Sequence, residues 1–351
     1  MTEKLSNDNK AQLESLYQTM EPEGLYPLWE KLGALVLPEP KSDCRIHKWD
    51  YDKAREYLMR AGDLISAKQA ERRVLILENP GLPGTSGVTT SLYAGLQLIL
   101  PGEIAPAHRH SQCALRFVLE GGGAYTSVDG EKAVMNPFDL VLTPGGQWHD
   151  HGNPTDKPMI WLDGLDIPTV RHFDASFAEH YHEDQFPEQA HAGDSLIRYG
   201  RNMRPLKGSA TDRRPAHQPL FHYPYADWRA NLDALAASGA EIDPHLGHAL
   251  EFLNPVNGGS IMATISAHVR LIPAGFETKP RRSTDATVFV VVEGSGQIMI
   301  DDEVIELRPR NIVVAPSWKK VAFKANDELI LFGYSDKACQ EKLGLYKEEN
   351  A

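Results

Sequence analysis

Cysteine is scarce in this sequence, and long apolar runs are absent from it. The 351 residues include three cysteines, Cys44, Cys113 and Cys339, an odd and widely spaced set that argues against a disulfide framework. No apolar run approaches the ~20 residues that span a bilayer, and the polar start MTEKLSNDNK lacks the apolar core of a signal peptide. We therefore expect a protein of the reducing cytoplasm, with no membrane partner.

Positive charge is also in short supply. Lysine and arginine number 36 against 48 aspartates and glutamates, for a net charge of −12, and no basic run exceeds the pairs at 281–282 and 319–320. Nucleic-acid binding needs a concentrated basic surface, so we expect no nucleic-acid partner. An anionic ligand would have to be attracted locally, by a few arginines and a metal, because the overall field repels it.

The hydrophobic pattern changes along the chain. Apolar residues at spacings of three and four predict helices at 9–20 and 51–65. From Val74 onward, short alternating or β-branched runs bounded by Gly, Pro and Asp predict strands, and a Val-Asp-Gly-Glu turn at 128–131 predicts a hairpin. Four regions follow: an N-terminal helical segment at 1–75, a strand-rich domain at 76–170, a helical or irregular connection at 171–258 and a second strand-rich domain at 259–351.

The two strand-rich domains are copies of one pattern. With Gly102 aligned to Gly275, LPGEIAP corresponds to IPAGFET, and FVLEGGGAYTSVDG corresponds to FVVVEGSGQIMIDD. After a one-residue gap, Pro144 corresponds to Pro316. The copies lie too far apart for a solenoid repeat, and many short strands with close turns favour a barrel or jelly roll. The sequence therefore predicts a mainly β protein with a duplicated domain.

Three histidines in the first copy have the pattern of metal ligands. His108 and His110 alternate along a predicted strand, so both side chains point to the same face, and His149 follows in a facing strand. An isolated His-x-His pair is more often two hydrogen-bonded core histidines. Here the third histidine and the surrounding glycines and prolines favour a metal site, and neutral imidazole suits Fe, Zn, Cu or Ni.

These segments resemble the two motifs of the cupin superfamily, a jelly-roll β-barrel that holds a metal between two strands. The resemblance implies two cupin domains, an N-terminal helical segment and a helical inter-domain connection. Spacing of this length in both segments is far more specific than a lone His-x-His. The matching segments are Gly102-x5-His108-x-His110 and Pro144-x-Gly146-x2-His149-x3-Asn153.

Two positions depart from the cupin pattern. The glutamate usual four or five residues beyond the second histidine of the pair is replaced by Ala114 and Leu115, and the glycine that often opens the second motif is replaced by Phe138. Without the glutamate, three neutral histidines would leave the ion its full charge and several open coordination positions. Such a layout is typical of a catalytic site rather than a closed structural one.

The second copy lacks these ligands. Opposite the three histidines stand Arg281, Ser283 and Val321. We therefore expect one metal per chain, and a second barrel that is structural, an assembly surface or a wall of the first site. His180 and His182 repeat the His-x-His spacing in a polar, acidic stretch and are expected on the solvated surface.

The connection between the domains holds two further histidines. We expect 227–239 and 247–254 to be helical or irregular, and His245 and His248 could then share one face of a helix. No third ligand is evident near them, so we assign them no function.

Other polar residues share the strand phase of the three histidines. Arg116 would point into the barrel, where a buried arginine needs an anionic partner. That partner is either a substrate carboxylate, held bidentately, or an acid elsewhere such as Asp163. His151 follows His149 by two residues and is either a hydrogen-bond donor or proton shuttle at the site, or a solvent-facing histidine at the barrel mouth.

Two further strands supply weaker candidates. Tyr93 and Gln97 share one face of the strand before the first motif. Gln97 is either an inward polar contact or a core glutamine satisfied by the backbone. Arg72 or Arg73 could reach an adjacent mouth of the barrel.

Almost the whole chain resembles the gentisate 1,2-dioxygenase family, two-cupin iron enzymes that cleave aromatic rings. The cupin motifs are shared by many activities, so the flanking segments support the finer assignment. These segments are LYPLWE at 25–30, ERRVLILENPGL at 71–82, LYAGLQLILPGE at 92–103, GGQWHDHGN at 145–153 and DPHLGHALEFLNPVNGG at 243–259.

The resemblance implies a role for each site residue. The family's iron-binding histidines match His108, His110 and His149. Its carboxylate-binding arginine matches Arg116, and its histidine beside the ligands matches His151, which would manage the phenolic proton.

The resemblance also implies the substrate and the assembly. Gln97 and Asp163 fall where related enzymes place polar groups, and Tyr93 stands where a salicylate-cleaving relative carries tryptophan, which favours gentisate. The implied reaction uses one Fe(II) per chain and O2 to cleave gentisate, a small aromatic hydroxy acid, between its carboxyl- and hydroxyl-bearing carbons, giving maleylpyruvate. The family also implies a homotetramer.

Three alternatives stay open. The same chemistry on salicylate or 1-hydroxy-2-naphthoate differs only in pocket residues. A cupin isomerase of the sugar-phosphate type would want a basic phosphate cluster and the missing glutamate. A cupin that only binds or stores would not need three intact ligands in one copy while the other copy lost them.

Overall fold

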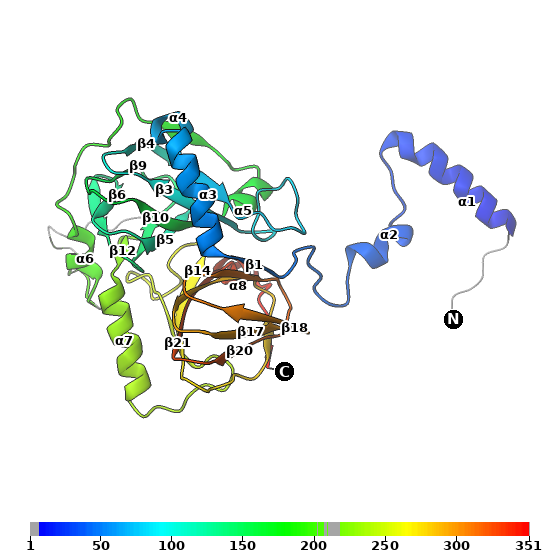
Figure 1. Cartoon of the computed structure of the whole chain (residues 1–351). Coiled ribbons are helices and arrows are strands. Elements are labelled where there is room, and N and C mark those ends of the chain that lie inside the picture. Colours follow the sequence, from blue (N-terminus) through cyan, green and yellow to red (C-terminus); the bar gives the residue numbers. More distant parts are fainter. Residues whose placement is uncertain (1–6, 202, 207–208, 210–217, 351) are drawn as a thin grey trace. The chain divides into compact units, whose positions relative to one another are not determined.

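The computed structural model describes residues 7–201, 203–206, 209 and 218–350 (Figure 1). The chain divides into two units, at 1–41 and 42–351. The first unit contains the helix α1 (Asn7–Met20), a short 3-10 turn and the helix α2 (Leu28–Leu35). The helix expected at 9–20 is therefore confirmed. Among the described residues, no helix has both the length and the apolar character needed to cross a membrane.

The first barrel of the second unit is built from two antiparallel sheets. Its strands are β2 (Val74–Ile76), β3 (Tyr93–Ile99), β4 (Ile104–His110), β5 (Ala114–Glu120), β6 (Ala124–Val128), β7 (Glu131–Met135), β8 (Leu140–Thr143), β9 (His149–Gly152), β10 (Met159–Leu165), β11 (Ala178–His180) and β12 (His222–Tyr223). One sheet has the order β12-β8-β5-β10-β3-β2, and the other has the order β11-β4-β9-β6-β7. The predicted hairpin joins β6 and β7 through Asp129 and Gly130, both with positive φ, as a type I′ turn requires.

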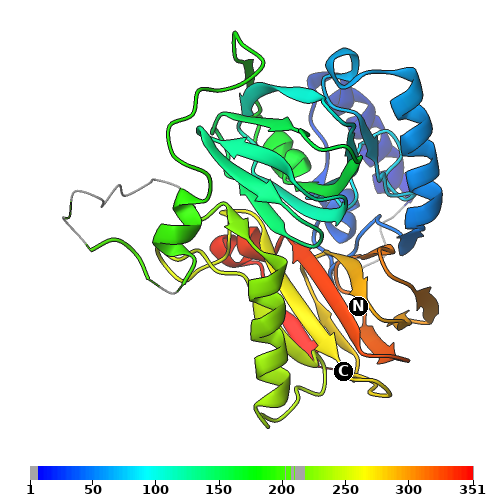
Figure 2. The same cartoon turned by 60° about the vertical axis from the view of Figure 1, so that its left-hand side comes forward.

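The second barrel repeats this arrangement. Its strands are β1 (His47–Trp49), β13 (His248–Glu251), β14 (Ser266–Ile272), β15 (Arg281–Ser283), β16 (Thr287–Glu293), β17 (Gly296–Ile300), β18 (Glu303–Leu307), β19 (Ile312–Ala315), β20 (Val321–Ala325), β21 (Leu329–Ser335) and β22 (Glu348–Asn350). The sheet orders are β1-β19-β16-β21-β14-β13 and β18-β17-β20-β15-β22. Figure 2 shows the two barrels stacked, with the second in yellow to red. The predicted mainly β fold with two jelly rolls is confirmed.

One apolar cluster joins the two barrels. The rings of Phe117 on β5 and Phe332 on β21 stack with centroids 4.0 Å apart and planes 7° from parallel. Because side chains alternate along a strand, Phe117 faces the other barrel while its neighbour Arg116 faces the interior of its own. Tyr334 is fully buried, and its hydroxyl donates to the carbonyl of Tyr93 across the junction at 3.0 Å. The second barrel therefore supports a strand of the first.

The remaining helices frame the barrels. The helix α3 (Tyr51–Leu64), expected at 51–65, begins after Asp50, whose side chain accepts from the Lys53 amide. The short α4 (Ala67–Ala70) begins with a capping box formed by Ser66 and Gln69. The connection contains α5 (Ile167–His172), α6 (Asp194–Tyr199) and α7 (Tyr225–Ala237), and α8 (Lys337–Leu343) follows the last long strand of the second barrel.

One expectation for the connection was wrong. Residues 248–251, expected to be helical or irregular, form β13, which pairs with β14 at the edge of a sheet. The hydrogen bonds of that edge outweigh a short helical pattern, since a segment of this length cannot form a stable helix alone. His245 and His248 therefore share no helical face. The boundaries of the four sequence regions stay a prediction.

Candidate metal centre

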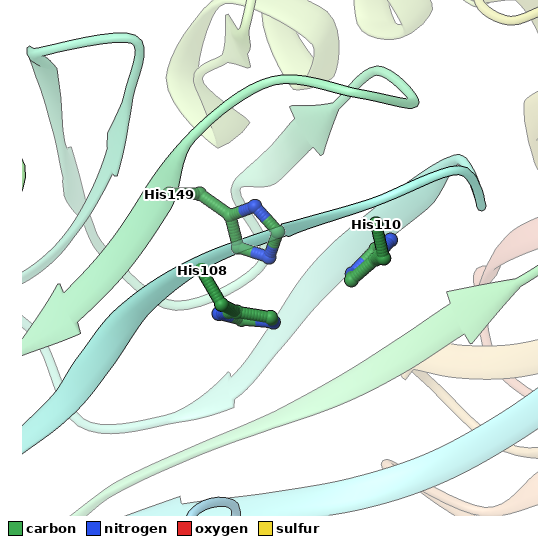
Figure 3. A group of neighbouring side chains, drawn as sticks. All are labelled: His108, His110 and His149. Atoms are coloured by element: carbon green, nitrogen blue, oxygen red, sulfur yellow. The ribbon is translucent and has the colours of Figure 1, made fainter. Parts of the chain in front are cut away.

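Three histidines converge inside the first barrel. His108 and His110 lie on β4, and His149 opens β9, with His108 directly opposite His149 in the ladder. The ring centroids of His108 and His149 are 4.1 Å apart, and those of His110 and His149 are 4.8 Å apart. One nitrogen of each ring lies within 4.8 Å of the others. Figure 3 shows the three rings turned toward one space between the two strands.

Local sequence explains how the two strands present these rings. The ladder between β4 and β9 shifts register between Ala105 and His108, where Pro106 has no N–H to donate. Before β9, Gly146 has φ of +83°, and its amide donates to the carbonyl of His110 at 2.7 Å. A Cβ on Gly145 would lie 2.3 Å from the carbonyl oxygen of Ser111. The two glycines of the second motif thus let this loop pack against the end of β4 and direct His149 inward.

Hydrogen bonds to carbonyls set the protonation of two rings. His110 Nδ1 lies 2.9 Å from the Gln112 carbonyl, and His149 Nδ1 lies 3.0 Å from the Gln147 carbonyl. A carbonyl only accepts, so each Nδ1 carries the proton and each Nε2 keeps a free lone pair. Burial lowers the pKa of His110 to about 4 and holds the pKa of His149 well below its usual value. Both rings are therefore neutral at neutral pH, as metal ligation requires.

The residues present fit a metal ion. His149 Nε2 is buried and has no hydrogen-bond partner among the described residues, which is a costly state for a polar atom unless something else binds it. Burial, followed by the charge of Arg72, lowers the pKa of His108 to about 2. Three neutral imidazoles with no carboxylate form an open ligand set for a divalent transition metal.

Arg116 lies close enough to the three histidines for its positive charge to affect their pKa values. It is 4% exposed, and its charge contributes to the lowered pKa of all three histidines. Its Nη1 donates to Thr143 Oγ1 at 2.6 Å, and its Nε lies 3.5 Å from Asp163 Oδ1. The ion pair with Asp163 therefore forms, although the Arg116 Nε remains without a hydrogen bond in the part of the chain that is described.

A side chain of its own strand, β10, also holds Asp163 in place. It lies directly opposite Arg116 in the β5–β10 ladder and accepts from the Trp161 indole at 2.9 Å. Burial raises the pKa of Asp163 to about 6, against the attraction of Arg116. The carboxyl group is therefore still mostly charged at neutral pH, and its ion pair with Arg116 is kept.

His151 is buried and close to the three histidines rather than at a solvent-facing mouth. It lies two residues after His149, and their ring centroids are 5.9 Å apart. Its Nδ1 lies 2.9 Å from the Thr126 hydroxyl, which in turn donates to the sulfur of Met135 at 3.3 Å. The Thr126 oxygen therefore accepts from Nδ1–H, and His151 Nε2, buried and unbonded within the described chain, keeps a free lone pair.

Tyr93 and Gln97 lie on β3, which borders β10. Gln97 is 3% exposed and lies opposite Trp161. A Cβ on Gly95, between them on the same face, would lie 2.7 Å from the Tyr93 hydroxyl oxygen. The glycine therefore makes room for the phenol over this face of the sheet.

Arg72, the weakest of the sequence candidates, lies directly against the histidine group. Its Nη2 donates to the Pro106 carbonyl at 2.7 Å and closely contacts Nδ1 of His108. Burial lowers the pKa of Arg72 to about 10, so it stays charged at neutral pH. Its neighbour Arg73 faces elsewhere and pairs with Glu103 at 2.6 Å.

Several supporting residues escaped the sequence analysis. Thr143 holds Arg116, Thr126 holds His151, and Trp161 holds Asp163. Trp161 and Asp163 are two residues apart on one strand, so the alternation of side chains could have predicted that this pair shares a face. Thr143 is 27 residues from Arg116 and Thr126 is 25 residues from His151, so no local pattern marks either contact.

The corresponding positions in the second barrel confirm the alignment of the two copies. Arg281 lies opposite Val321 in the β15–β20 ladder, as His108 lies opposite His149 in the first barrel. His180, on the short edge strand β11, is exposed, as expected, and so is His182. His245 is half-buried, and its Nδ1 lies within 3.2 Å of the carbonyls of Lys279 and Pro280.

Comparison with known proteins adds a family to this geometry. The model of the cupin domain matches residues 95–165. The chain is 52% identical to "Gentisate 1,2 dioxygenase 1" of Aquipseudomonas alcaligenes, over 95% of this chain and 94% of that one, and 33% identical to a 5-aminosalicylate 1,2-dioxygenase of Comamonas sp, over 96% and 90%. A salicylate 1,2-dioxygenase of Pseudoaminobacter salicylatoxidans, solved as an adduct with gentisate, superposes with a TM-score of 0.91 at 34% identity, covering 100% of this chain and 96% of that one.

Proposed function

Because the chain belongs to the gentisate 1,2-dioxygenase family, we propose that it cleaves gentisate (2,5-dihydroxybenzoate) with O2. The bond between the carboxyl-bearing and the hydroxyl-bearing carbon breaks, and both oxygen atoms of O2 enter the product, maleylpyruvate. The observation that carries this proposal is the juxtaposition of three neutral histidines with a buried arginine whose Nε has no hydrogen bond in the described chain. Such a site offers metal ligands and a carboxylate receptor together.

The proposed metal is one Fe(II) per chain, held by His108, His110 and His149. When bound, Fe(II) would supply the redox chemistry that makes O2 reactive toward the ring. Affinity alone favours Zn or Cu over Fe(II) at such a site, so the choice of iron rests on the chemistry and on the family.

The chain's own residues orient the substrate. The Nε–H of Arg116 is paired with Asp163 at 3.5 Å but makes no hydrogen bond within the described chain, and we assign it to the substrate carboxylate, in a charge-assisted hydrogen bond. Arg72 supplies a second positive charge beside His108, and Gln97, Tyr93 and Asp163 form the polar wall. Together the two arginines attract an anion that the net charge of −12 repels.

His151 is the proposed proton acceptor. Its Nε2 lone pair is buried, is not bonded within the described chain, and is held in that tautomer by Thr126. It would take the proton of the ring hydroxyl next to the carboxylate, which enriches the ring in electrons. The surrounding buried strands keep bulk water from the reacting ring.

Tyr93 supports gentisate over salicylate, because its hydroxyl offers a polar partner above β3, where a salicylate-cleaving relative carries tryptophan. A homotetramer in the cytoplasm is the proposed state of the enzyme, by analogy with the family.

The test is O2 uptake by the protein stripped of metal and reloaded with Fe(II) under anaerobic conditions. Gentisate, salicylate and 1-hydroxy-2-naphthoate are compared, with Mn-loaded, Zn-loaded and metal-free protein as controls. We expect stoichiometric uptake with gentisate and the Fe(II) protein alone. Uptake with salicylate as well would show that Tyr93 does not set the specificity, and no uptake with any acid despite bound iron would refute ring cleavage.

A further inference from the structure

The second barrel contains a partly open cavity of its own. Its volume is about 280 Å³, and its lining includes His268 and Arg270 of β14, Phe289 of β16 and Val321 of β20. This size is close to the lower end of the roughly 300–1,000 Å³ of small-molecule sites. The cavity therefore has room for a small organic molecule.

Strand register shows what has replaced the first site's polar groups. In the first barrel, Asp163 lies opposite both Gly95 and Arg116. In the second barrel, Gly333 lies opposite both His268 and Phe289. The acid and the arginine of the first barrel thus correspond to a glycine and a phenylalanine.

The second barrel has an inward-facing arginine, but on a strand that corresponds to β3 and not to β5. Arg270 lies two residues after His268, as Gln97 lies two residues after Gly95, so Arg270 holds the place of Gln97. The second barrel therefore keeps an inward-facing guanidinium in its cavity, although it has arginine, serine and valine in place of the metal ligands.

Among the described residues, Arg270 has no ion-pair partner. Its Nε is buried without a hydrogen bond, and no described residue pairs with it. The guanidinium lies over the rings of Phe289 and Phe323, at 5.4 and 5.8 Å from their centroids. Burial lowers the pKa of Arg270 to about 10, so it is charged at neutral pH. The side chain is half-buried and its Nε is fully buried, so its charge is only partly solvated and an anion entering the cavity would be attracted to it.

The other arginine and the two lysines that line the cavity are already paired, and the exposed carboxylate of Glu251, opposite His268 in the β13–β14 ladder, also belongs to the lining. Arg281 pairs with Glu348, Lys319 with Asp301 at 2.8 Å, and Lys337 with Glu341 at 3.7 Å. Asp285 also lines the cavity and attracts Arg270 at longer range, but it accepts from the Ser283 hydroxyl at 2.5 Å and forms no ion pair with Arg270. Within the described part of the chain, Arg270 is therefore the arginine of this cavity that has no ion-pair partner.

His268 adds a second polar group. Its Nε2 is buried and has no partner among the described residues, and it lies two residues from Arg270 on the same face of β14. A Cβ on Gly333 would lie 2.7 Å from this nitrogen, so the glycine is what allows the imidazole to lie across the sheet. Phe289 and Val321 supply an apolar wall beside these polar groups.

We propose that the second barrel binds a small organic carboxylate without a metal, with the carboxylate on Arg270 and His268 and the apolar body against Phe289 and Val321. The apolar wall and the stacked guanidinium favour an organic acid over inorganic phosphate. The site is independent of ring cleavage, so the proposal stands or fails separately from the reaction at the first barrel.

The test is calorimetric titration of the iron-loaded full chain with benzoate under anaerobic conditions. Benzoate can also bind at Arg116, so the titration is done in the Arg116→Met background. There we expect Arg270→Met to weaken the remaining benzoate binding roughly 10- to 100-fold, the loss of hydrogen bonds to a charged group. The matched control is Arg282→Met, an arginine on β15 that pairs with Glu349 and does not line the cavity.

Benzamide and inorganic phosphate complete the design. We expect neither to bind in an Arg270-dependent manner. Three results would overturn the proposal: no benzoate binding in the Arg116→Met protein, equal binding of benzamide, or Arg270-dependent binding of phosphate without benzoate. If Arg270→Met does not fold, Arg270→Lys replaces it, because lysine keeps the charge but loses the two-pronged contact. An unchanged benzoate affinity in that variant would also contradict the proposal.

Discussion

The hydrogen bond between Arg116 and Thr143 offers a sharp test of how the first site recognises its substrate. Thr143→Val removes the hydroxyl while nearly preserving the shape of the side chain. The bond is 2.6 Å long and buried, and its donor is charged. The variant therefore leaves a second guanidinium N–H without an acceptor and frees the side chain to turn toward Asp163.

The magnitude follows from that geometry. A buried hydrogen bond to a charged group contributes about 1.5–3 kcal/mol, which corresponds to roughly 10- to 150-fold in an equilibrium constant. If Arg116 binds the substrate carboxylate equally in the ground state and the transition state, the loss is expected in KM for gentisate, with kcat largely kept. Thr143→Ser restores the hydroxyl and should restore KM.

The assay is steady-state O2 uptake at varied gentisate, beside urea unfolding of each variant. The matched control is Thr278→Val in the second barrel, where the lost hydroxyl accepts from the Phe323 amide at 2.8 Å and is equally buried. That variant should lose stability without a change in KM. An unchanged KM in Thr143→Val, or the same rise in both variants, would refute the assignment of Arg116.

Three further predictions concern the ligands, the barrel junction and the acid response. His149→Ala should abolish iron retention through gel filtration, measured by elemental analysis, whereas His180→Ala, on the exposed edge strand, should retain it. Tyr334→Phe should cost about 1 kcal/mol of unfolding free energy in urea, and it should lower kcat because the Tyr93 carbonyl loses its donor; unchanged values would show that the junction does not support β3. Burial of Glu103 is outweighed by bonds from Arg73, Leu100 and Ala67, which hold its pKa below its usual value. Its stabilisation is thus present above the unfolded pKa and lost as pH falls through the folded one, so Glu103→Gln should flatten the fall in stability below about pH 4.5; an equally steep fall there would contradict this.

The convergence of the three histidines could be predicted because it depends on local rules. Alternation along a strand places His108 and His110 on one face, and the spacing of glycine and proline around His149 indicates a facing strand. The same alternation places Arg116 and His151 inside the barrel, and both are buried there. Such inferences need only a strand and its period.

The edge strands could not be predicted in the same way. β1 joins the second barrel from a segment that precedes the first, and β13 joins it from a segment expected to be helical or irregular. Each is only three or four residues long, so its own sequence carries almost no preference. The open edge of an existing sheet decides its conformation.

The sequence by itself determined the duplication, the mainly β fold and the three-histidine set, since each is written in periodicity and spacing. The tertiary structure alone decided which group satisfies each buried polar atom. It brings Thr143 to Arg116, Thr126 to His151 and the Tyr334 hydroxyl to β3, and it leaves Arg270 without an acceptor in the described chain. The physical reason is that hydrogen bonding depends on distances between atoms of separate strands, and packing, not chain order, sets those distances.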